Sequence, residues 1–278
     1  MMGENHSNSG AKGNEKRMKV AVIQMDVSIG EPERNRERAL ARMEEAVNGG
    51  AEKPDVLVLP EMWNTGYSLE NIEEIADANG EPTHAMMSAF AAKHGVNVVA
   101  GSVANRTEGG VNNTIFVYDR TGARTSEYSK IHLFRLMEEE KYLKQGGELG
   151  RLVVDGEAAG MMVCYDIRFP ELTRRLALDG AKVLFVPAQW PKPRLHHWRT
   201  LLLARAIENQ MFVVACNRVG VSRGTEFFGN SMIISPWGDV LAEGGEEETI
   251  LRATLDLAEA DRVRGTIPVF QDRRPELY

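Results

Sequence analysis

The sequence predicts an α/β fold in a single domain, and three observations support this prediction. Short apolar runs, typical of buried strands, alternate with longer segments whose apolar residues recur at helical spacing. The second half of the chain repeats this alternation, and no linker-like stretch separates the two halves. The 278 residues are 43% hydrophobic and 26% charged, which is ordinary for a globular protein.

The first half begins with a near-continuous apolar run, MKVAVIQMDV, which predicts a buried strand at residues 18–27. Apolar residues at helical spacing predict a helix at 32–47, which the glycine pair after it ends. The same reasoning predicts a second helix at 83–94 and further strands at 55–61, 96–103, 113–119 and 123–128.

The second half follows the same pattern. Helices are predicted at 171–178 and 194–209, and strands at 152–154, 158–164, 182–188 and 211–216. Short strands near Ser231, Val240 and Leu251 are expected to form a meander. Alternating strands and helices predict sheets covered by helices.

The bulk composition excludes several classes of protein. A net charge of -7 and a pI near 5.5 argue against a nucleic-acid binder, and no apolar run approaches the ~18 residues of a membrane span. The sequence has only two cysteines, so a disulfide framework is not expected. We expect a reducing compartment instead, and hence a cytoplasmic location. Residues 1–17 are polar and have no apolar core, which predicts a disordered tail before a domain at 18–278.

Three chemically useful residues lie where predicted strands end. Glu61 follows the apolar segment LVLP, Lys130 follows a strand in EYSKIHLF, and Cys164 ends the apolar run MMVC before the charged turn YDIRFPE. Ligands of α/β folds gather at strand ends. The three positions are therefore candidates for one site.

A glutamate, a lysine and a cysteine suit nucleophilic catalysis. A cation favours the thiolate, a carboxylate can take the thiol proton and pass it to a leaving amine, and an ammonium with a backbone N–H can hold an oxyanion. Each residue also has a structural interpretation: Cys164 as a small buried hydrophobe, Glu61 as a helix cap and Lys130 as a solvated loop residue. Spacing alone does not join three positions so far apart, so both interpretations stay open on the residues alone.

The segments LPEMWNTGY, YSKIHLF and CYDIRFPE, in this order, resemble the nitrilase superfamily of carbon–nitrogen hydrolases over about residues 18–270. The resemblance implies a four-layer α-β-β-α sandwich, usually paired, so a homodimer or higher homo-oligomer is expected. It also implies that Cys164 is the nucleophile, Glu61 the general base and Lys130 the oxyanion-stabilising cation. This chemistry needs no cofactor, and none is expected.

A second glutamate often joins this site in the family, and the run LMEEEKYLKQGGE offers Glu138, Glu139 and Glu140. Family members commonly have an acid seven residues before a glycine in this loop. Counting back from Gly146 favours Glu139 as a catalytic-site carboxylate. A solvated acidic run is the structural alternative.

Three further residues are predicted to bind substrate. The backbone N–H of Tyr165 is placed to face the oxyanion, as in the nucleophile elbows of other folds. Arg168 either contacts a substrate carboxylate or braces the turn by pairing with Asp166 or Glu171. Trp190, at another strand end, either walls the pocket or packs in the core.

Other candidates are weaker. Cys216 sits within an apolar strand and is predicted to be core. His196 and His197 are adjacent, and neighbouring side chains on a helix do not converge, so no metal site is expected there. The sequence has no zinc spacing, P-loop or GxGxxG motif.

Within the superfamily, LFRLMEEEKYLKQGG and WRTLLLARAIENQMFVVACNR resemble the omega-amidase branch, which hydrolyses 2-oxoglutaramate to 2-oxoglutarate and ammonia. The resemblance thus implies a small-molecule amide as substrate. An N-carbamoyl amino acid or β-ureido amidohydrolase is the alternative, and a nitrilase is less favoured. A non-catalytic scaffold is disfavoured because Glu61, Lys130 and Cys164 are all present.

Overall fold

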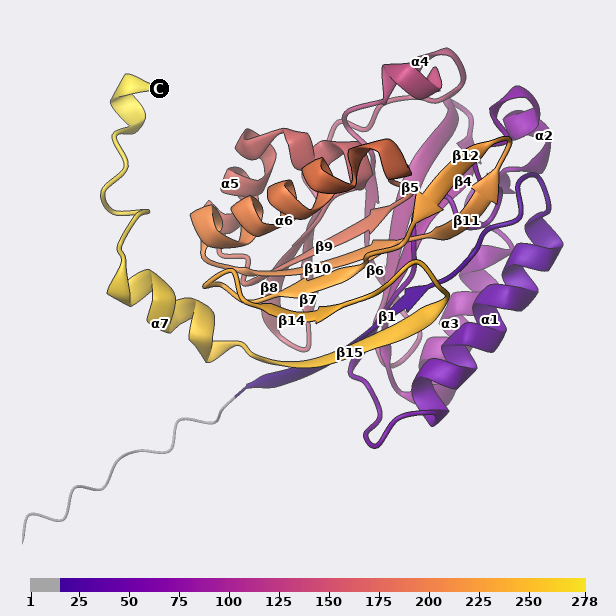
Figure 1. Cartoon of the computed structure of the whole chain (residues 1–278). Coiled ribbons are helices and arrows are strands. Elements are labelled where there is room, and N and C mark those ends of the chain that lie inside the picture. Colours follow the sequence, from indigo (N-terminus) through magenta and orange to yellow (C-terminus); the bar gives the residue numbers. More distant parts are fainter. Residues whose placement is uncertain (1–15) are drawn as a thin grey trace, which may run out of the picture.

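The apolar strands of the chain pair into two β-sheets that pack against each other, with helices on their outer faces (Figure 1). The computed structural model describes residues 16–278. Residues 1–15 of the predicted polar tail (residues 1–17) lie outside the described residues. The first strand begins at Arg17, one residue before the predicted start of the domain. No helix among the described residues is long and apolar enough to cross a membrane.

The first sheet contains the N-terminal strand and the strands of the first half. Its central strands are parallel, and its two edges are antiparallel. Its strands, in spatial order, are β15 (Thr249–Asp256), β1 (Arg17–Gln24), β2 (Val56–Val58), β4 (Asn97–Thr107), β5 (Gly110–Tyr118) and β6 (Arg124–Ser129), with β3 (Asp77–Ala78) beside β4.

The second sheet is built from the second half of the chain. Its strands, in spatial order, are β14 (Val240–Glu243), β13 (Met232–Ile234), β10 (Phe212–Asn217), β9 (Val183–Ala188), β8 (Glu157–Met161) and β7 (Arg151–Val154). A separate hairpin pairs β11 (Val219–Ser222) with β12 (Thr225–Phe228).

Helices form the two outer layers. The helices α1 (Pro32–Asn48) and α3 (Thr83–His94) lie on the first sheet, and α5 (Pro170–Leu178) and α6 (Leu195–Asn209) lie on the second (Figure 1). The shorter α-helices are α2 (Ile72–Ile75), α4 (Glu139–Tyr142) and α7 (Ala258–Thr266). Short 3₁₀ turns are η1 (Leu69–Asn71), η2 (Arg135–Met137), η3 (Cys164–Arg168), η4 (Lys192–Arg194) and η5 (Pro275–Leu277).

The strand β1 shows why the layers form. Its successive side chains point to opposite faces of the sheet. Val20 and Val22 join the core shared with the second sheet, whereas Ala21 and Ile23 join the core under α1 and α3. A strand segment buried on both faces is predominantly apolar, which explains the run VAVI at residues 20–23. The predicted four-layer α-β-β-α sandwich is confirmed.

Two sequence-based predictions are corrected by the structure. The predicted strand at 158–164 ends at Met161, and Cys164 begins the turn η3 instead of closing the strand. The segment near Leu251 does not continue a meander with β13 and β14. It is β15, which crosses to the other sheet and pairs with β1 along its whole length. The strand β15 pairs with β1, which is distant in the sequence, and the alternation of apolar and polar residues within a strand does not indicate which strand it pairs with. The hairpin β11–β12 and the helix α7 were not predicted.

Candidate active site

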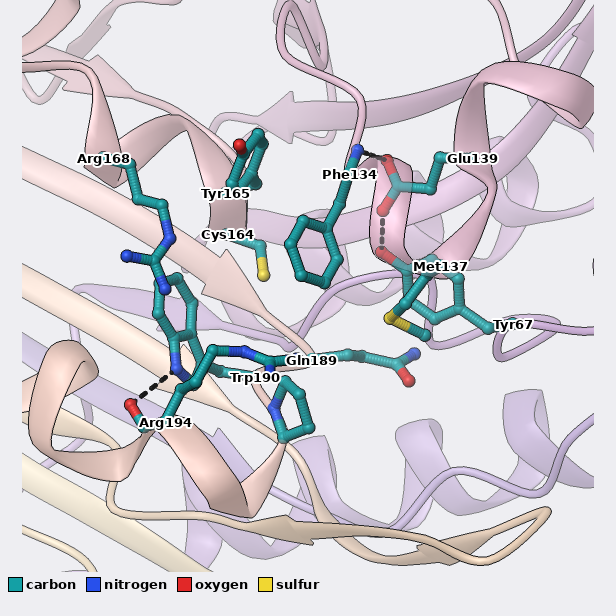
Figure 2. Close-up of a pocket in the computed structure, with 11 residues that line it drawn as sticks. Tyr67, Phe134, Met137, Glu139, Cys164, Tyr165, Arg168, Gln189, Trp190 and Arg194 are labelled. Atoms are coloured by element: carbon teal, nitrogen blue, oxygen red, sulfur yellow. Dashed lines mark hydrogen bonds between the residues drawn. The ribbon is translucent and has the colours of Figure 1, made fainter.

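Four predicted side chains from distant parts of the chain meet at one point between the sheets. The ammonium Nζ of Lys130, which follows β6, is 3.0 Å from Glu61 Oε1 and 2.8 Å from Glu139 Oε1. Glu61 follows β2, Glu139 opens α4, and the side chains of Glu61, Lys130 and Glu139 are all buried. Cys164 lies beside the same group, and its thiol hydrogen-bonds to the Glu61 carboxylate. Figure 2 shows its sulfur pointing into a pocket that Glu139 also lines.

The carboxylate of Glu61 is fixed by donors from three directions besides Lys130. Its Oε1 accepts hydrogen bonds from Tyr67 Oη at 2.7 Å and Asn113 Nδ2 at 2.9 Å. Its Oε2 accepts one from the backbone N–H of Gln189 at 2.7 Å. The Gln189 side chain in turn donates to the Glu61 carbonyl oxygen at 2.7 Å. These bonds leave the carboxylate little freedom to rotate.

The backbone that carries Glu61 is held against β4. The N–H of Ser102 donates to the Pro60 carbonyl at 3.1 Å, and Ser102 Oγ accepts from the N–H of Met62 at 3.0 Å. Gly101 makes this approach possible, because it has a φ of +62° and a Cβ there would lie 2.1 Å from the Pro60 oxygen. The irregular stretch of β4 at Gly101 therefore places the glutamate.

The charges of the site stabilise one another. Burial alone would raise the pKa of Glu61, but the Lys130 ammonium and the hydrogen bonds from Tyr67, Lys130 and Cys164 hold this pKa below the usual glutamate value. Burial would lower the pKa of Lys130, yet Glu139 and Glu61 raise it above the usual value. Lys130 is thus charged and Glu61 is ionised at neutral pH.

Glu139 behaves differently from Glu61. Burial raises the pKa of Glu139; Lys130 opposes this shift, and the charge of Glu61 adds to it. The fewer donors around Glu139 are consistent with this difference, since its Oε2 accepts a bond from the Phe134 N–H at 3.0 Å and its Oε1 contacts Tyr67 and Lys130. Of the three candidates in the acidic run, Glu139 is the buried one, and Glu138 and Glu140 are exposed.

Cys164 sits in a strained turn that aims its side chain. Its φ is 45°, in the left-handed region that non-glycine residues seldom adopt, at a cost of about 1–3 kcal/mol. Asp166 holds the turn: its Oδ2 accepts from the N–H of Val163 at 2.9 Å and from Tyr128 Oη at 2.6 Å. Its Oδ1 accepts from the backbone N–H of His132 at 3.0 Å. The buried carboxylate thus ties the turn to the segment around Lys130.

The thiol of Cys164 is neutral at rest. Burial and the charge of Glu61 raise its pKa well above the usual cysteine range, and Lys130 offsets only part of this shift. Lys130 does favour the thiolate, as expected of a nearby cation, but its charge is shared with two carboxyl groups. A neutral thiol that attacks a substrate loses its proton in doing so, and Glu61 is the ionised carboxylate in contact with this thiol.

Comparison with known proteins places this geometry in a family. The sequence pattern named "Carbon-nitrogen hydrolase" matches residues 19–265. The chain belongs to the carbon–nitrogen hydrolase family. It is therefore a hydrolase that acts on carbon–nitrogen bonds.

Similar members of the family carry amidase names. A 2-oxoglutaramate amidase of Bacillus subtilis is 49% identical over 93% of this chain and 98% of its own length. The omega-amidase YafV of Escherichia coli is 37% identical over 78% of this chain and 84% of its own length. A solved carbon–nitrogen hydrolase superfamily protein of Xanthomonas campestris, with an arsenic adduct in its active site, superposes with a TM-score of 0.86 at 32% identity, covering 93% of this chain and 98% of its own.

In this carbon–nitrogen hydrolase, Arg168 does not pair with Asp166 or Glu171, as the bracing alternative required. Asp166 is occupied by the donors described above. The Arg168 guanidinium lies over the Trp190 ring at 4.7 Å, and its Nη2 is 3.2 Å from His197 Nδ1. No ion pair to Arg168 exists among residues 16–278, and its guanidinium lines the pocket (Figure 2).

The pocket of the hydrolase brings the predicted substrate-binding residues together and adds another cation. Trp190 is buried and donates from Nε1 to the Arg194 carbonyl at 2.9 Å, so it walls the pocket and packs in the core at once. The Arg194 guanidinium lies 5.5 Å from the Phe134 ring centre. The lining residues are Tyr67, Phe134, Met137, Glu139, Cys164, Tyr165, Arg168, Gln189, Trp190, Pro191 and Arg194.

Sequence reasoning missed Tyr67, Asn113, Asp166 as the brace of the turn, Gln189 and Arg194. Tyr67 lies within the motif LPEMWNTGY, and its closeness to Glu61 was a usable signal. Asn113 and Gln189 are reached only through strand pairing, so no local pattern indicates them.

Of the remaining candidates, Cys216 lies apart from the site, whereas His197 contacts the pocket residue Arg168. Cys216 is buried within β10, where its Sγ donates to the Ile23 carbonyl at 3.2 Å. His196 and His197 are exposed, and their ring centres are 6.4 Å apart. Within the described part of the chain, no group of three or more His, Cys, Asp and Glu side chains is placed to hold a metal ion.

Proposed function

We propose that this chain is an omega-amidase that hydrolyses 2-oxoglutaramate to 2-oxoglutarate and ammonia. One observation carries the proposal: a Cys–Glu–Lys site lies in a pocket whose wall presents the guanidinium groups of Arg168 and Arg194, and neither pairs with an acid among the described residues. An amide whose far end is a carboxylate supplies the missing negative charge. The relatives named 2-oxoglutaramate amidase and omega-amidase support the same substrate.

The arginines suit a carboxylate for physical reasons. A planar guanidinium donates two parallel hydrogen bonds to a carboxylate, and aromatic faces hold it without neutralising its charge. Arg168 lies on Trp190 and Arg194 lies against Phe134, so both groups are oriented before substrate arrives. Trp190 also offers an apolar surface to the methylene groups between the two ends of the substrate.

The proposed reaction begins with Glu61 and Cys164. Glu61 takes the thiol proton as the sulfur attacks the amide carbon, forming the C–S bond and moving the carbonyl electrons onto oxygen. Lys130 has a third N–H bond beyond the two directed at carboxyl groups, and with the N–H of Tyr165 it stabilises the oxyanion. Glu139 lies on the other side of Lys130 and holds its ammonium in place.

The C–N bond then breaks, and Glu61 gives its proton to the leaving nitrogen, which departs as ammonia. Water attacks the resulting thioester while Glu61 takes a proton from it. The carboxylic acid is released, and the proton returns to the sulfur. Each step uses Glu61 as the single proton carrier, which fits an ionised carboxylate in contact with the thiol.

Ammonia release over a panel of compounds tests the function. The panel contains 2-oxoglutaramate, an uncharged amide of similar length, an N-carbamoyl amino acid and a nitrile. We expect the highest kcat/KM with 2-oxoglutaramate. Faster turnover of the N-carbamoyl amino acid would favour the alternative amidohydrolase, and equal turnover of the uncharged amide would remove the proposed role of the arginines.

We also propose that the protein is a cytoplasmic homodimer or higher homo-oligomer. Both cysteines are free, which suits a reducing compartment. Large apolar side chains are exposed on α5 (Leu178), on α6 (Ile207) and in the C-terminal segment (Ile267 and Leu277), and this segment extends away from the sandwich (Figure 1). Light scattering on the purified protein measures the number of copies, and a strictly monomeric mass would contradict this part of the proposal.

A further inference from the structure

The hydroxyl of Tyr67 bridges the two carboxyl groups of the site. Its Oη is 2.7 Å from Glu61 Oε1 and 2.8 Å from Glu139 Oε1, and both distances are those of hydrogen bonds (Figure 2 shows the Glu139 contact). A phenol has one proton to donate, and an ionised carboxylate only accepts. If both glutamates were ionised, one of these two contacts would hold two oxygens together with no proton between them.

The charges lead to the same difficulty. Lys130 is the cation that contacts both carboxyl groups, and all three side chains are buried. Two carboxylates with one ammonium would leave a net negative charge away from water, which is costly. The Cys164 thiol also faces this group, and it is neutral. One additional proton on a glutamate removes the excess charge and completes the second hydrogen bond of Tyr67.

The surrounding donors decide which glutamate holds this proton. Apart from Tyr67, Glu61 accepts hydrogen bonds from Lys130, Asn113 and the Gln189 N–H. Glu139 has two such donors, Lys130 and the N–H of Phe134. Hydrogen bonds to the charged form favour that form, so Glu61 is the better place for the negative charge. The opposite pKa shifts of the two groups agree, lowered for Glu61 and raised for Glu139.

We propose that Glu139 is un-ionised in the resting enzyme, donates its proton from Oε1 to Tyr67 Oη, and that Tyr67 donates its own proton to Glu61 Oε1. Tyr67 is then a positioning residue that keeps Glu61 as the single base of the site. It also keeps the Lys130 charge from being divided between two anions. The protonation states do not depend on the proposed function, whereas their kinetic consequence rests on the proposed role of Glu61.

Infrared difference spectroscopy tests the location of the proton without any turnover. An un-ionised carboxylic acid has a carbonyl stretch separate from the carboxylate bands. We expect this band in the wild-type protein at about pH 8, where exposed glutamates are ionised, and its loss in Glu139→Gln. Asp77, whose pKa burial raises to about 6, is ionised by then and does not interfere. Glu140→Gln, an exposed neighbour, is the matched control and should keep the band.

Two spectroscopic outcomes would overturn the proposal. One is the absence of the band in the wild type. The other is a band that persists in Glu139→Gln and vanishes in Glu61→Gln. If Glu139→Gln does not fold, Tyr67→Phe serves instead: removal of the hydroxyl that accepts the Glu139 proton should shift the band to higher frequency. An unshifted band in folded Tyr67→Phe would equally overturn it.

A pH profile of kcat/KM tests the second proposed hydrogen bond, from Tyr67 to Glu61. The Tyr67 hydrogen bond lowers the pKa of Glu61, so Tyr67→Phe should raise this pKa. The acid limb of the profile should then move up by about one pH unit, the equivalent of one hydrogen bond to a charged group. Tyr142→Phe, in the nearby α4, should leave the profile in place. An unmoved acid limb in Tyr67→Phe, with the infrared band present, would overturn the link from Tyr67 to Glu61. Absence of amidase activity in the wild type would contradict only the proposed function.

Discussion

The second sheet carries two buried, free cysteines that differ in almost everything except their ionisation. Cys164 follows β8, and Cys216 lies within β10, on the other side of β9. Burial raises the pKa of both thiols well above the usual range. A raised pKa therefore does not distinguish a reactive cysteine from a core cysteine in this protein, and the neighbouring groups must do so.

Their surroundings make the distinction. Cys216 lies in β10, between β9 and β13, where it pairs with Pro187 of β9, and its thiol meets a backbone carbonyl. Cys164 has left its strand, adopts a positive φ and contacts the ionised Glu61. A carboxylate beside the thiol lets the proton leave at the moment of attack, so a low resting pKa is not required. Under the proposed mechanism, the turn and the neighbouring carboxylate, more than the acidity of the thiol, make Cys164 a nucleophile.

The largest expected effect comes from replacing each of the two cysteines by alanine in a separate variant. Cys164→Ala should abolish ammonia release, because no other group replaces the nucleophile. Cys216→Ala should keep turnover within about twofold and lower the free energy of unfolding by about 1 kcal/mol, the cost of a small cavity. Activity and thermal unfolding of both variants provide the measurement. Retained turnover in Cys164→Ala, or loss of all turnover in folded Cys216→Ala, would reverse the comparison.

The next largest effect on activity should come from Glu61 and Lys130, the charged residues that lie beside Cys164 and have no counterparts beside Cys216. Glu61→Gln keeps the shape of the side chain but removes the proton acceptor, and Lys130→Arg replaces a compact charge with a planar group. Each should lower kcat by at least about 100- to 1,000-fold, the effect of removing one oxyanion donor. Single-turnover kinetics provide the measurement, with Glu140→Gln as an exposed control. Near-normal turnover in Glu61→Gln would show that another group takes the thiol proton.

The arginines should affect one class of substrate. Arg168→Lys and Arg194→Gln should each lower kcat/KM for 2-oxoglutaramate by about 10- to 100-fold, the equivalent of about 1.5–3 kcal/mol for a hydrogen bond to a charge. The loss should appear mainly in KM, and an uncharged amide of similar length should change little. Equal losses on both substrates would mean that the arginines only support the pocket structurally.

The smallest effect should follow from loosening the turn. Tyr128→Phe removes one hydrogen bond to Asp166, while the donors from Val163 and His132 remain. We expect a fall of about 1.5–3 kcal/mol in the free energy of unfolding and less than a tenfold loss of kcat. Chemical denaturation and initial rates measure the two quantities. A loss of kcat as large as that of Glu61→Gln would indicate that Tyr128 takes part in the chemistry itself.

The fold was predictable where periodicity carries the information. The continuous apolar run of β1 and the helical spacing of α1 and α3 were recognised because burial on two faces or on one stripe shapes the local sequence. The crossing of β15 to the other sheet was not, because strand pairing depends on distant segments. The end of β8 was misplaced because the apolar MMVC continues the strand pattern after its hydrogen bonding stops.

The site was predictable in its residues and not in its connections. Glu61, Lys130 and Cys164 lie at strand ends within distinctive motifs, so their identities were accessible. That Tyr67 bridges Glu61 and Glu139 depends on distances between segments and is absent from any spacing. Arg194 was overlooked because it precedes α6 among other charged residues, and only the folded pocket sets it apart.

The covalent intermediate tests the central claim most directly. Wild-type protein is mixed with 2-oxoglutaramate, quenched in acid during turnover and digested, and the cysteine peptides are analysed by mass spectrometry. We predict the acyl group of the substrate on the peptide that contains Cys164, with the Cys216 peptide unmodified. An acyl group on Cys216, or steady ammonia release with no acyl group on either cysteine at any quench time, would contradict the account.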